Sequence, residues 1–271
     1  MLKWKRSANR TKKEQEDTGL KEGTIGTEEY AIRFSQQIEK INSANGSALA
    51  EYIAHRKVIL DLLEYNLYRT DGGAYQTESI LHDLVYPMRT TSDETPYGNH
   101  NLWLIDEKLA YCSYISSDIP FNNDNKEKRT DILILDHPVA VSDEDNHGSE
   151  YDTISIFELK RPMRDDYSGN SNPISQLYEY VRKLKTNQKR DKNGRLIKVG
   201  ANTKFYLYAV CDITGSLTDI LDEDDFVETP DKLGYYRFNQ KYNAYIEVLS
   251  YDKILNDAKK RNKVLFDKLG I

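Results

Sequence analysis

The chain has 271 residues, of which 38% are apolar and 30% charged, a composition typical of a globular protein with one large core. Its net charge of −6 argues against binding nucleic acid through overall charge, so any such contact must come from a local basic patch. The apolar stretches are too short to span a membrane and the polar start lacks a signal-peptide core. We therefore expect a cytoplasmic protein without membrane contact, and the spacing of its two cysteines indicates neither a metal site nor a disulfide.

The first part of the chain is predicted to be helical. Residues 1–26 read as a flexible charged leader, and a helical extension follows over 27–74. Capping residues and apolar spacing predict separate helices at 27–42, 47–69 and 77–87. The stretch "LWLIDEKLAYCSYI", which starts at Leu102, reads as a strand in its first residues.

From residue 129 the pattern changes to strands, and we expect one domain over 75–271. The predicted class is α/β (α+β), with a mixed central sheet flanked by helices. The strands and helices that we expect are a strand at 129–136, a strand at 153–160, a helix at 172–187, a hairpin turn at 191–194, a strand at 204–213, two strand-like stretches at 234–240 and 243–250, and a closing helix at 251–270.

The segment "ISIFELKRP" (154–162) places a carboxylate and an ammonium on what reads as the buried face of a strand. If the strands at 129–136 and 153–160 pair as a simple hairpin, Asp131 lies opposite Glu158, with Cβ atoms about 4.5–5.5 Å apart. Two carboxylates at that distance repel each other unless a cation lies between them. Mg²⁺ accepts such ligands together with waters or phosphate, and Lys160 would lie close enough to stabilise charge on a phosphate oxygen.

These residues resemble the motif of the PD-(D/E)XK nuclease superfamily, in which Asp131 is followed at a distance by Glu158-Leu159-Lys160. Glu78 stands where many members carry an extra acidic residue. Gln176 and Tyr180 reproduce the Q-x-x-x-Y signature of the branch that includes recombination helicase–nucleases. The resemblance covers roughly residues 75–213 and implies a restriction-endonuclease-like core; it departs from the pattern at Thr130, where proline is usual.

The resemblance implies a metal-dependent nuclease with Mg²⁺ or Mn²⁺ as its cofactor and DNA as its substrate, acting in bacterial antiphage defence or DNA repair. The catalytic residues that it implies are Asp131, Glu158, Lys160, Gln176 and Glu78. The metal ligands that it implies are Asp131, Glu158, Glu78 and the backbone carbonyl of Leu159. The alternative that we keep is a catalytically idle nuclease fold that binds DNA or protein and works with a partner ATPase.

Nucleic-acid binding by this acidic chain would require a local basic patch. Such a patch begins on the Q-x-x-x-Y helix and continues beyond it. Its candidate nucleic-acid-binding residues are Arg182, Lys183, Lys185, Lys189, Arg190 and Lys192, with Arg195 and Lys198 beyond them. Tyr180, Arg161 and Arg164 would extend the patch toward the expected metal site. The structural alternative is a solvated helix end and turn.

A second resemblance concerns "YIAHRKVILDLLEYNL", "NLWLIDEKLAYCSYISSD" and the ending "SYDKILNDAKKRNKVLFDKLGI". These segments look like the C-terminal, nuclease-like region of bacterial Hsp90-like ATPase proteins, some of which are linked to antiphage effectors. This chain has no phosphate-binding glycine loop of its own. The resemblance therefore implies the nuclease part alone, with an Hsp90-like ATPase that is either a separate partner or missing. Self-association through the apolar stripe of 27–69 is a further possibility.

Each of these residues also has a purely structural explanation. Glu158 and Lys160 would form a solvated salt bridge, Asp131 a strand-start cap and Glu78 an acidic first helical turn, while Gln176 and Tyr180 would form a helix flank. His82, one turn after Glu78, is expected to be a lone surface histidine rather than a metal ligand. The acidic runs are expected to be surface loops; they are Asp143, Glu144 and Asp145, and the run from Asp222 to Asp225.

Overall fold

The structure is a computed structural model that describes residues 28–69, 73–112, 114–124, 126, 128–136 and 150–271. The expected leader at 1–26 and the acidic loop residues Asp143, Glu144 and Asp145 lie outside the described residues. The chain divides after His55, and residues 56–271 form one compact unit. The candidate site lies in this unit.

A mixed β-sheet forms the centre of the unit. Within the described residues it has seven strands in the order β1-β2-β3-β4-β7-β6-β5. Their bounds are β1 Tyr114–Ser117, β2 Ile132–Asp136, β3 Tyr151–Leu159, β4 Val199–Val210, β5 Val227–Glu228, β6 Gly234–Asn239 and β7 Ala244–Leu249. The three central strands β3, β4 and β7 run parallel to one another, and antiparallel strands flank them on both sides.

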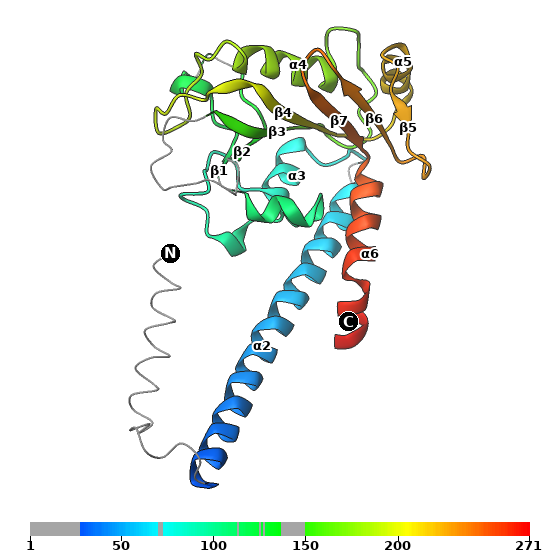
Figure 1. The fold of residues 1–271 in the computed structure, drawn as a ribbon. Coiled ribbons are helices and arrows are strands. Elements are labelled where there is room, and N and C mark those ends of the chain that lie inside the picture. The colour runs from blue at the N-terminus through cyan, green and yellow to red at the C-terminus, as the bar shows by residue number, and fades with distance from the viewer. Residues whose placement is uncertain (1–27, 70–72, 113, 125, 127, 137–149) are drawn as a thin grey trace. The chain divides into compact units, whose positions relative to one another are not determined.

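Helices lie on both faces of this sheet, so the expected α/β class with a mixed sheet flanked by helices is confirmed. Figure 1 shows α4 and α5 on one face and α3 and α6 on the other. The helix bounds are α2 Glu28–Leu67, α3 Glu78–Val85, α4 Pro173–Leu184, α5 Gly215–Glu223 and α6 Tyr251–Leu269. Short 3₁₀ helices lie between α3 and β1, at Tyr97–Asn99, Leu102–Leu104 and Glu107–Tyr111, and another lies between β1 and β2, at Phe121–Asn123.

The connection from β3 to β4 builds the core on one face of the sheet. Asn172 caps α4 by accepting a hydrogen bond from the backbone N–H of Ser175 at 2.8 Å, and Pro173 takes the first helical position. One face of α4 is apolar and packs on alternate residues of β2, β3, β4 and β7. The α4 residues in this core are Ile174, Leu177, Tyr180, Val181 and Leu184.

The predicted β2–β3 hairpin is confirmed in its register. Asp136 pairs with Thr153 and Ile132 with Phe157. Ile154 and Ile156 pack in the core beneath α4, as the alternation of this strand predicts. The turn at 191–194 also forms, since Arg190 and Leu196 bridge across it.

Two element predictions are wrong. The expected helices at 27–42 and 47–69 belong to one continuous helix, α2, because Gly46 costs a helix only about 1 kcal/mol. The stretch from Leu102 is not a strand: Leu102, Trp103 and Leu104 form a 3₁₀ turn and are all buried, and the strand begins only at Tyr114. A short, fully buried apolar run carries no period that separates a strand from a helix.

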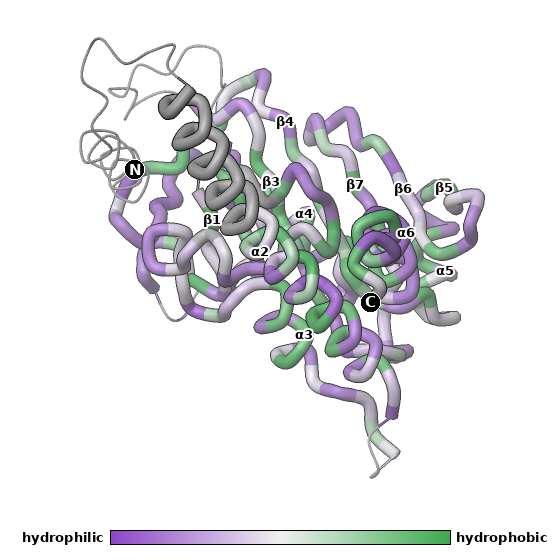
Figure 2. Tube along the Cα trace, turned by 90° about the horizontal axis from the view of Figure 1, so that it is seen from below, coloured by the Kyte–Doolittle hydropathy of each residue, from purple (hydrophilic) through white to green (hydrophobic). Residues whose placement is uncertain are grey.

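Residue hydropathy differs between a helix that packs in the fold and a loop that joins two strands. Figure 2 shows hydrophobic residues on α3 and hydrophilic residues in the loop from β6 to β7. In the part of the chain that the structure describes, no helix is both long enough and apolar enough to cross a bilayer. Cys112 and Cys211 are both free thiols.

Candidate active site

The site begins where β2 starts and β3 ends. Asp131 precedes β2 directly, and continuing the register from the Ile132–Phe157 pair places it opposite Glu158. The backbone N–H of Leu159 donates to Oδ2 of Asp131 at 2.6 Å, so the carboxylate points at the end of β3. The predicted approach of these two distant carboxylates is therefore present in the fold.

Lys160 lies among the carboxylates. Its Nζ donates to Oε1 of Glu158 at 2.5 Å and lies 3.9 Å from Oε2 of Glu78, at the start of α3. Glu158 and Lys160 are only 3% and 5% exposed, whereas the Glu78 side chain is 39% exposed. A solvated surface salt bridge is therefore the wrong description of the Glu158–Lys160 pair.

The charges in this cluster shift each other's protonation. Desolvation, and after it the charge of Glu158, raises the pKa of Asp131 well above its ordinary value. Desolvation raises the pKa of Glu158 even though Lys160 opposes the shift. Burial alone would lower the pKa of Lys160, but Glu158, Glu78 and Asp131 together raise it, so the ammonium remains charged. The cluster thus has three carboxyl groups and one ammonium, and burial disfavours the ionised form of Asp131 and Glu158.

One atom of the cluster has no partner. Oε2 of Glu158 is buried and accepts no hydrogen bond, although an unpaired buried carboxylate oxygen is costly. Carboxylate oxygens are ligands that Mg²⁺ and Mn²⁺ prefer, so the donor set fits such an ion chemically. No group of three or more His, Cys, Asp or Glu among the described residues is arranged to hold a metal. Lys160 occupies the space between Glu158 and Glu78 instead.

The two residues of the Q-x-x-x-Y signature lie one turn apart on α4. Gln176 is half-buried near the start of the helix, whereas Tyr180 is buried beneath it. The Tyr180 hydroxyl donates to the backbone carbonyl of Arg129, two residues before Asp131. Burial raises the pKa of Tyr180, and Glu158 and Asp131 add to the shift. Tyr180 therefore fixes the segment that carries Asp131 and is not placed on a solvent-exposed binding surface.

Two buried tyrosines beside the cluster carry no signal in the sequence. Tyr251, the first residue of α6, donates its hydroxyl to the backbone carbonyl of Lys160 at 2.6 Å. Tyr167 is 8% exposed and its hydroxyl has no hydrogen-bond partner. Both lie outside the motif, and only the folded chain brings them next to β3.

His82 is not the surface histidine that the sequence predicts. It is buried, and its Nε2 lies 2.8 Å from the hydroxyl of Ser117 on β1. Desolvation lowers its pKa against the pull of Asp118. It ties α3 to the edge of the sheet, which holds Glu78, one turn earlier on α3, beside β3.

The basic residues divide into two groups. Arg161 follows Lys160 directly and is exposed. Arg164 pairs with Asp166 at 2.6 Å and lies over the ring of Tyr167 at 5.0 Å. The charge of Glu78 contributes to the raised pKa of Arg164 after the larger effect of Asp166, which places Arg164 on the Glu78 side of the cluster.

The remaining basic residues begin at the C-terminal end of α4, and several are matched by acids. Lys183 pairs with Glu179 at 3.1 Å, Lys192 with Glu94 at 2.6 Å and Arg195 with Asp191 at 2.8 Å. Lys185 lies over the ring of Phe205, which pairs with Ile154 and so lies about 13 Å along the sheet from Glu158. Arg182 is exposed, Lys189 is half-buried, and the Arg190 guanidinium donates to the carbonyl of Gly194. This group continues away from the cluster.

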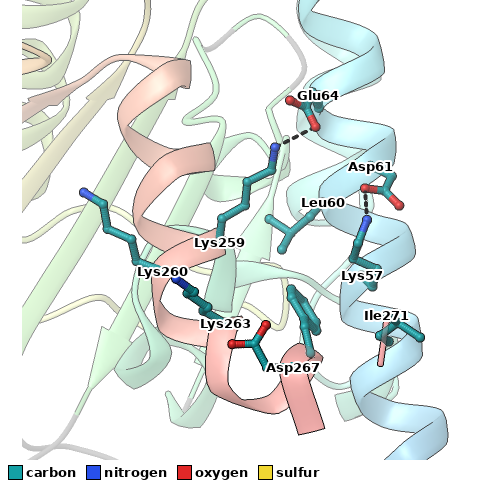
Figure 3. Close-up of a pocket in the computed structure, with 10 residues that line it drawn as sticks. Lys57, Leu60, Asp61, Glu64, Lys259, Lys260, Lys263, Asp267 and Ile271 are labelled. Carbon is teal, nitrogen blue, oxygen red and sulfur yellow. Dashed lines mark hydrogen bonds and ion pairs between the residues drawn. The ribbon is translucent and has the colours of Figure 1, made fainter. Parts of the chain in front are cut away.

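A separate cavity of about 410 Å³ lies between α2 and α6, away from these carboxylates (Figure 3). Ion pairs cross or flank it, with Lys259 bonded to Glu64 at 2.6 Å and Lys57 to Asp61 at 2.5 Å. Leu60 and Phe266 form its apolar floor. Partly exposed ion pairs of this kind stabilise little, and we assign no chemistry to this cavity.

The expected acidic turn from Asp222 to Asp225 lies at the end of α5, where three of its four residues are exposed. It takes no part in the cluster.

Comparison of the chain with protein-family models, with curated proteins and with solved structures gives no match.

Proposed function

We propose that this chain is a metal-dependent nuclease that hydrolyses phosphodiester bonds, with DNA as its substrate and a restriction-endonuclease-like core around the site. The single observation that carries the proposal is the convergence of Asp131, Glu158 and Lys160 at one end of the β2–β3 hairpin. A strand that only fills a core has no use for buried charges, because desolvating them costs several kcal/mol for each ion. Their retention supports a chemical role.

The proposed cofactor is Mg²⁺ or Mn²⁺, held by Asp131, Glu158 and the Leu159 carbonyl, with Glu78 at the edge of the site. When bound, such an ion polarises a phosphoryl oxygen and activates water. The orphaned Oε2 of Glu158 and the presence of three carboxyl groups around one ammonium support this assignment.

The side chains of the chain have separate roles in the proposed reaction. The Lys160 ammonium orients the attacking water and stabilises negative charge that develops on the phosphate oxygens. Tyr180 and Tyr251 hold the backbone at Arg129 and at Lys160, which keeps the two strand ends in register. We assign the half-buried Gln176 to the margin of the site, and Arg161 and Arg164 to contacts with phosphates beside it.

A cleavage assay tests the proposal directly. Supercoiled plasmid, linear duplex, single-stranded DNA and RNA are incubated with the protein and Mg²⁺ or Mn²⁺, with EDTA as the metal-free control. Glu158→Gln and Lys160→Met are each expected to slow cleavage by about 10²-fold or more. Glu228→Gln and Lys204→Met, which change exposed residues of β5 and β4, are the matched controls and keep the wild-type rate. Cleavage that survives in Glu158→Gln would rule out the assigned site.

The closed Glu158–Lys160 pair favours one alternative, a nuclease fold that binds DNA without cutting it. Retention of DNA in EDTA, with no strand breaks when either metal is added, would support that module. Whether the protein cuts DNA or only binds it, we propose a role in antiphage defence or DNA repair with an Hsp90-like ATPase as the partner.

A further inference from the structure

The carboxylates of the cluster already have a cation, and it is Lys160. Its ammonium is bonded to Glu158 at 2.5 Å and lies within 4 Å of Glu78, while Asp131 lies opposite Glu158 on the adjacent strand. Three carboxylates and one ammonium give the cluster a charge of about −2 when all are ionised, which a divalent cation would cancel. The Lys160 side chain therefore lies where that cation would be most stable.

Because Glu158 and Lys160 are both buried, separating their charges costs free energy. A buried carboxylate that loses its only counter-ion is destabilising by several kcal/mol, so Glu158 requires a cation when no metal is bound. Oε1 of Glu158 has Lys160, but Oε2 has no partner. The ammonium thus bonds to one oxygen of the Glu158 carboxylate and leaves the other oxygen available to a metal ion.

We propose that Lys160 is a built-in competitor of the divalent cation: it stabilises the metal-free cluster by bonding to Glu158, and it must leave Oε1 when the metal binds. The same side chain thereby sets the metal affinity and, once displaced from Glu158, faces the substrate. The site becomes competent only at metal concentrations that outcompete an internal ammonium. This inference rests on the proposed function only in assuming that a divalent cation binds at Glu158 and Asp131.

The geometry around Lys160 supports such a movement. Its backbone is held at two points, with the N–H donating to the carbonyl of Val210 at 2.9 Å and the carbonyl accepting from Tyr251 at 2.6 Å. The backbone therefore stays in place while the flexible four-carbon side chain turns from Glu158 toward Glu78, whose carboxylate is partly exposed. The change requires a new rotamer and no rearrangement of the sheet.

Thermal unfolding measured against Mn²⁺ concentration tests the inference, because a ligand that binds only the folded state raises Tm by an amount that grows with the logarithm of its concentration relative to its dissociation constant. Without metal, Lys160→Met is expected to melt several degrees below wild type, since Glu158 loses its counter-ion. With metal, the Lys160→Met variant is expected to bind Mn²⁺ with a dissociation constant at least about tenfold lower than that of wild type. Lys160→Gln, which keeps a hydrogen-bond donor but no charge, is the second variant if Lys160→Met fails to fold.

The controls locate the effect. Lys204→Met removes an exposed lysine of β4 and is expected to match wild type at every Mn²⁺ concentration. Glu158→Gln is expected to abolish the Mn²⁺-dependent shift, alone and combined with the Lys160 variants.

The outcomes separate the inference from the proposed function. Unchanged Mn²⁺ affinity in both Lys160 variants overturns the competition, even if the wild-type protein cuts DNA. Tighter binding in these variants, together with no cleavage by wild type, supports the competition and removes the nuclease assignment. No Glu158-dependent shift in any variant overturns both.

Discussion

At the residue scale, the proposed function depends on a few side chains that other side chains hold in place. The Lys160 backbone is held by Tyr251, whose hydroxyl lies 2.6 Å from the Lys160 carbonyl. Tyr251 is 2% exposed, so water does not replace the bond when it is lost. Removing the hydroxyl alone therefore tests how far the site depends on this positioning.

Tyr251→Phe is expected to lower the free energy of unfolding by about 1–2 kcal/mol, because it leaves a buried carbonyl without this donor. The cleavage rate at 25 °C is expected to fall about threefold to tenfold, since small misplacements of reacting groups are costly. Urea unfolding and plasmid cleavage measure the two effects. Tyr236→Phe, which alters a tyrosine that is 38% exposed, is the control. An unchanged rate in Tyr251→Phe would remove the positioning role.

A second residue-scale prediction concerns His100, which is buried and stacks on Tyr86 with ring centroids 5.5 Å apart. Desolvation lowers its pKa below 6.5, so the folded state keeps it neutral at pH values where the unfolded chain binds a proton. The contribution of neutral His100 to the free energy of unfolding is therefore complete above pH 6.5. It is lost as the pH falls through the folded pKa, by up to about 1.4 kcal/mol per pH unit.

Urea unfolding at pH 7.5 and pH 5.5 measures this linkage. His100→Gln is expected to lose less stability between these two pH values than wild type does. Equal losses in the two proteins would show that His100 does not couple folding to pH.

At the element scale, the β2–β3 hairpin and α4 define the site. α4 begins at Pro173 beside the residues that follow β3, and its cap is Asn172. The Asn172 side chain accepts from the N–H of Ser175 at 2.8 Å and donates to the carbonyls of Ser168 and Gly169, at 3.0 Å each. The cap thus joins the helix to the loop that follows β3.

Asn172→Ala is expected to destabilise the protein by about 1–2 kcal/mol, the usual effect of losing a helix cap together with a loop contact. Asn172→Ser, which can still cap the helix, is expected to recover most of this loss. Thermal unfolding compares the two variants. Equal melting temperatures for Asn172→Ala and wild type would contradict the role of the cap.

Local patterns predicted these elements well and the basic surface poorly. Alternation along 153–160 and an antiparallel pairing were enough to bring Asp131 opposite Glu158, because strand register follows from counting residues. The Lys183–Glu179 and Arg195–Asp191 pairs join residues four positions apart. The Lys192–Glu94 pair, by contrast, could not be predicted, since its residues are 98 positions apart in the chain. Tyr251 and Tyr167 were missed for the same reason: nothing near them in sequence marks a residue that packs against a distant strand.

At the scale of the whole molecule, one arginine connects three parts of the compact unit. Arg56 on α2 forms two bonds with Glu107, at 2.6 and 2.8 Å, and a third with Asn262 on α6, at 3.0 Å. Its guanidinium also lies 4.4 Å from the centre of the Trp103 ring. Few substitutes satisfy all of these contacts, because the planar fork of arginine meets the carboxylate and the ring together.

Arg56→Met is expected to lower the free energy of unfolding by about 2–3 kcal/mol, less than for a fully buried pair because Glu107 is partly exposed. Lys57→Met removes a neighbouring exposed ion pair and is expected to cost less than about 0.5 kcal/mol. Urea unfolding distinguishes the two. A similar small loss in both variants would show that the Arg56 network contributes little to stability.

The central claim is that Asp131 and Glu158 converge in order to hold a divalent cation. Its most direct test is the anomalous diffraction of Mn²⁺ in crystals of the protein grown or soaked with that ion. The account predicts an anomalous peak within coordination distance of both carboxylates, with the Lys160 ammonium moved away from Oε1 of Glu158. Crystals with saturating Mn²⁺ that show no peak there, and with Lys160 still bonded to Glu158, would contradict it.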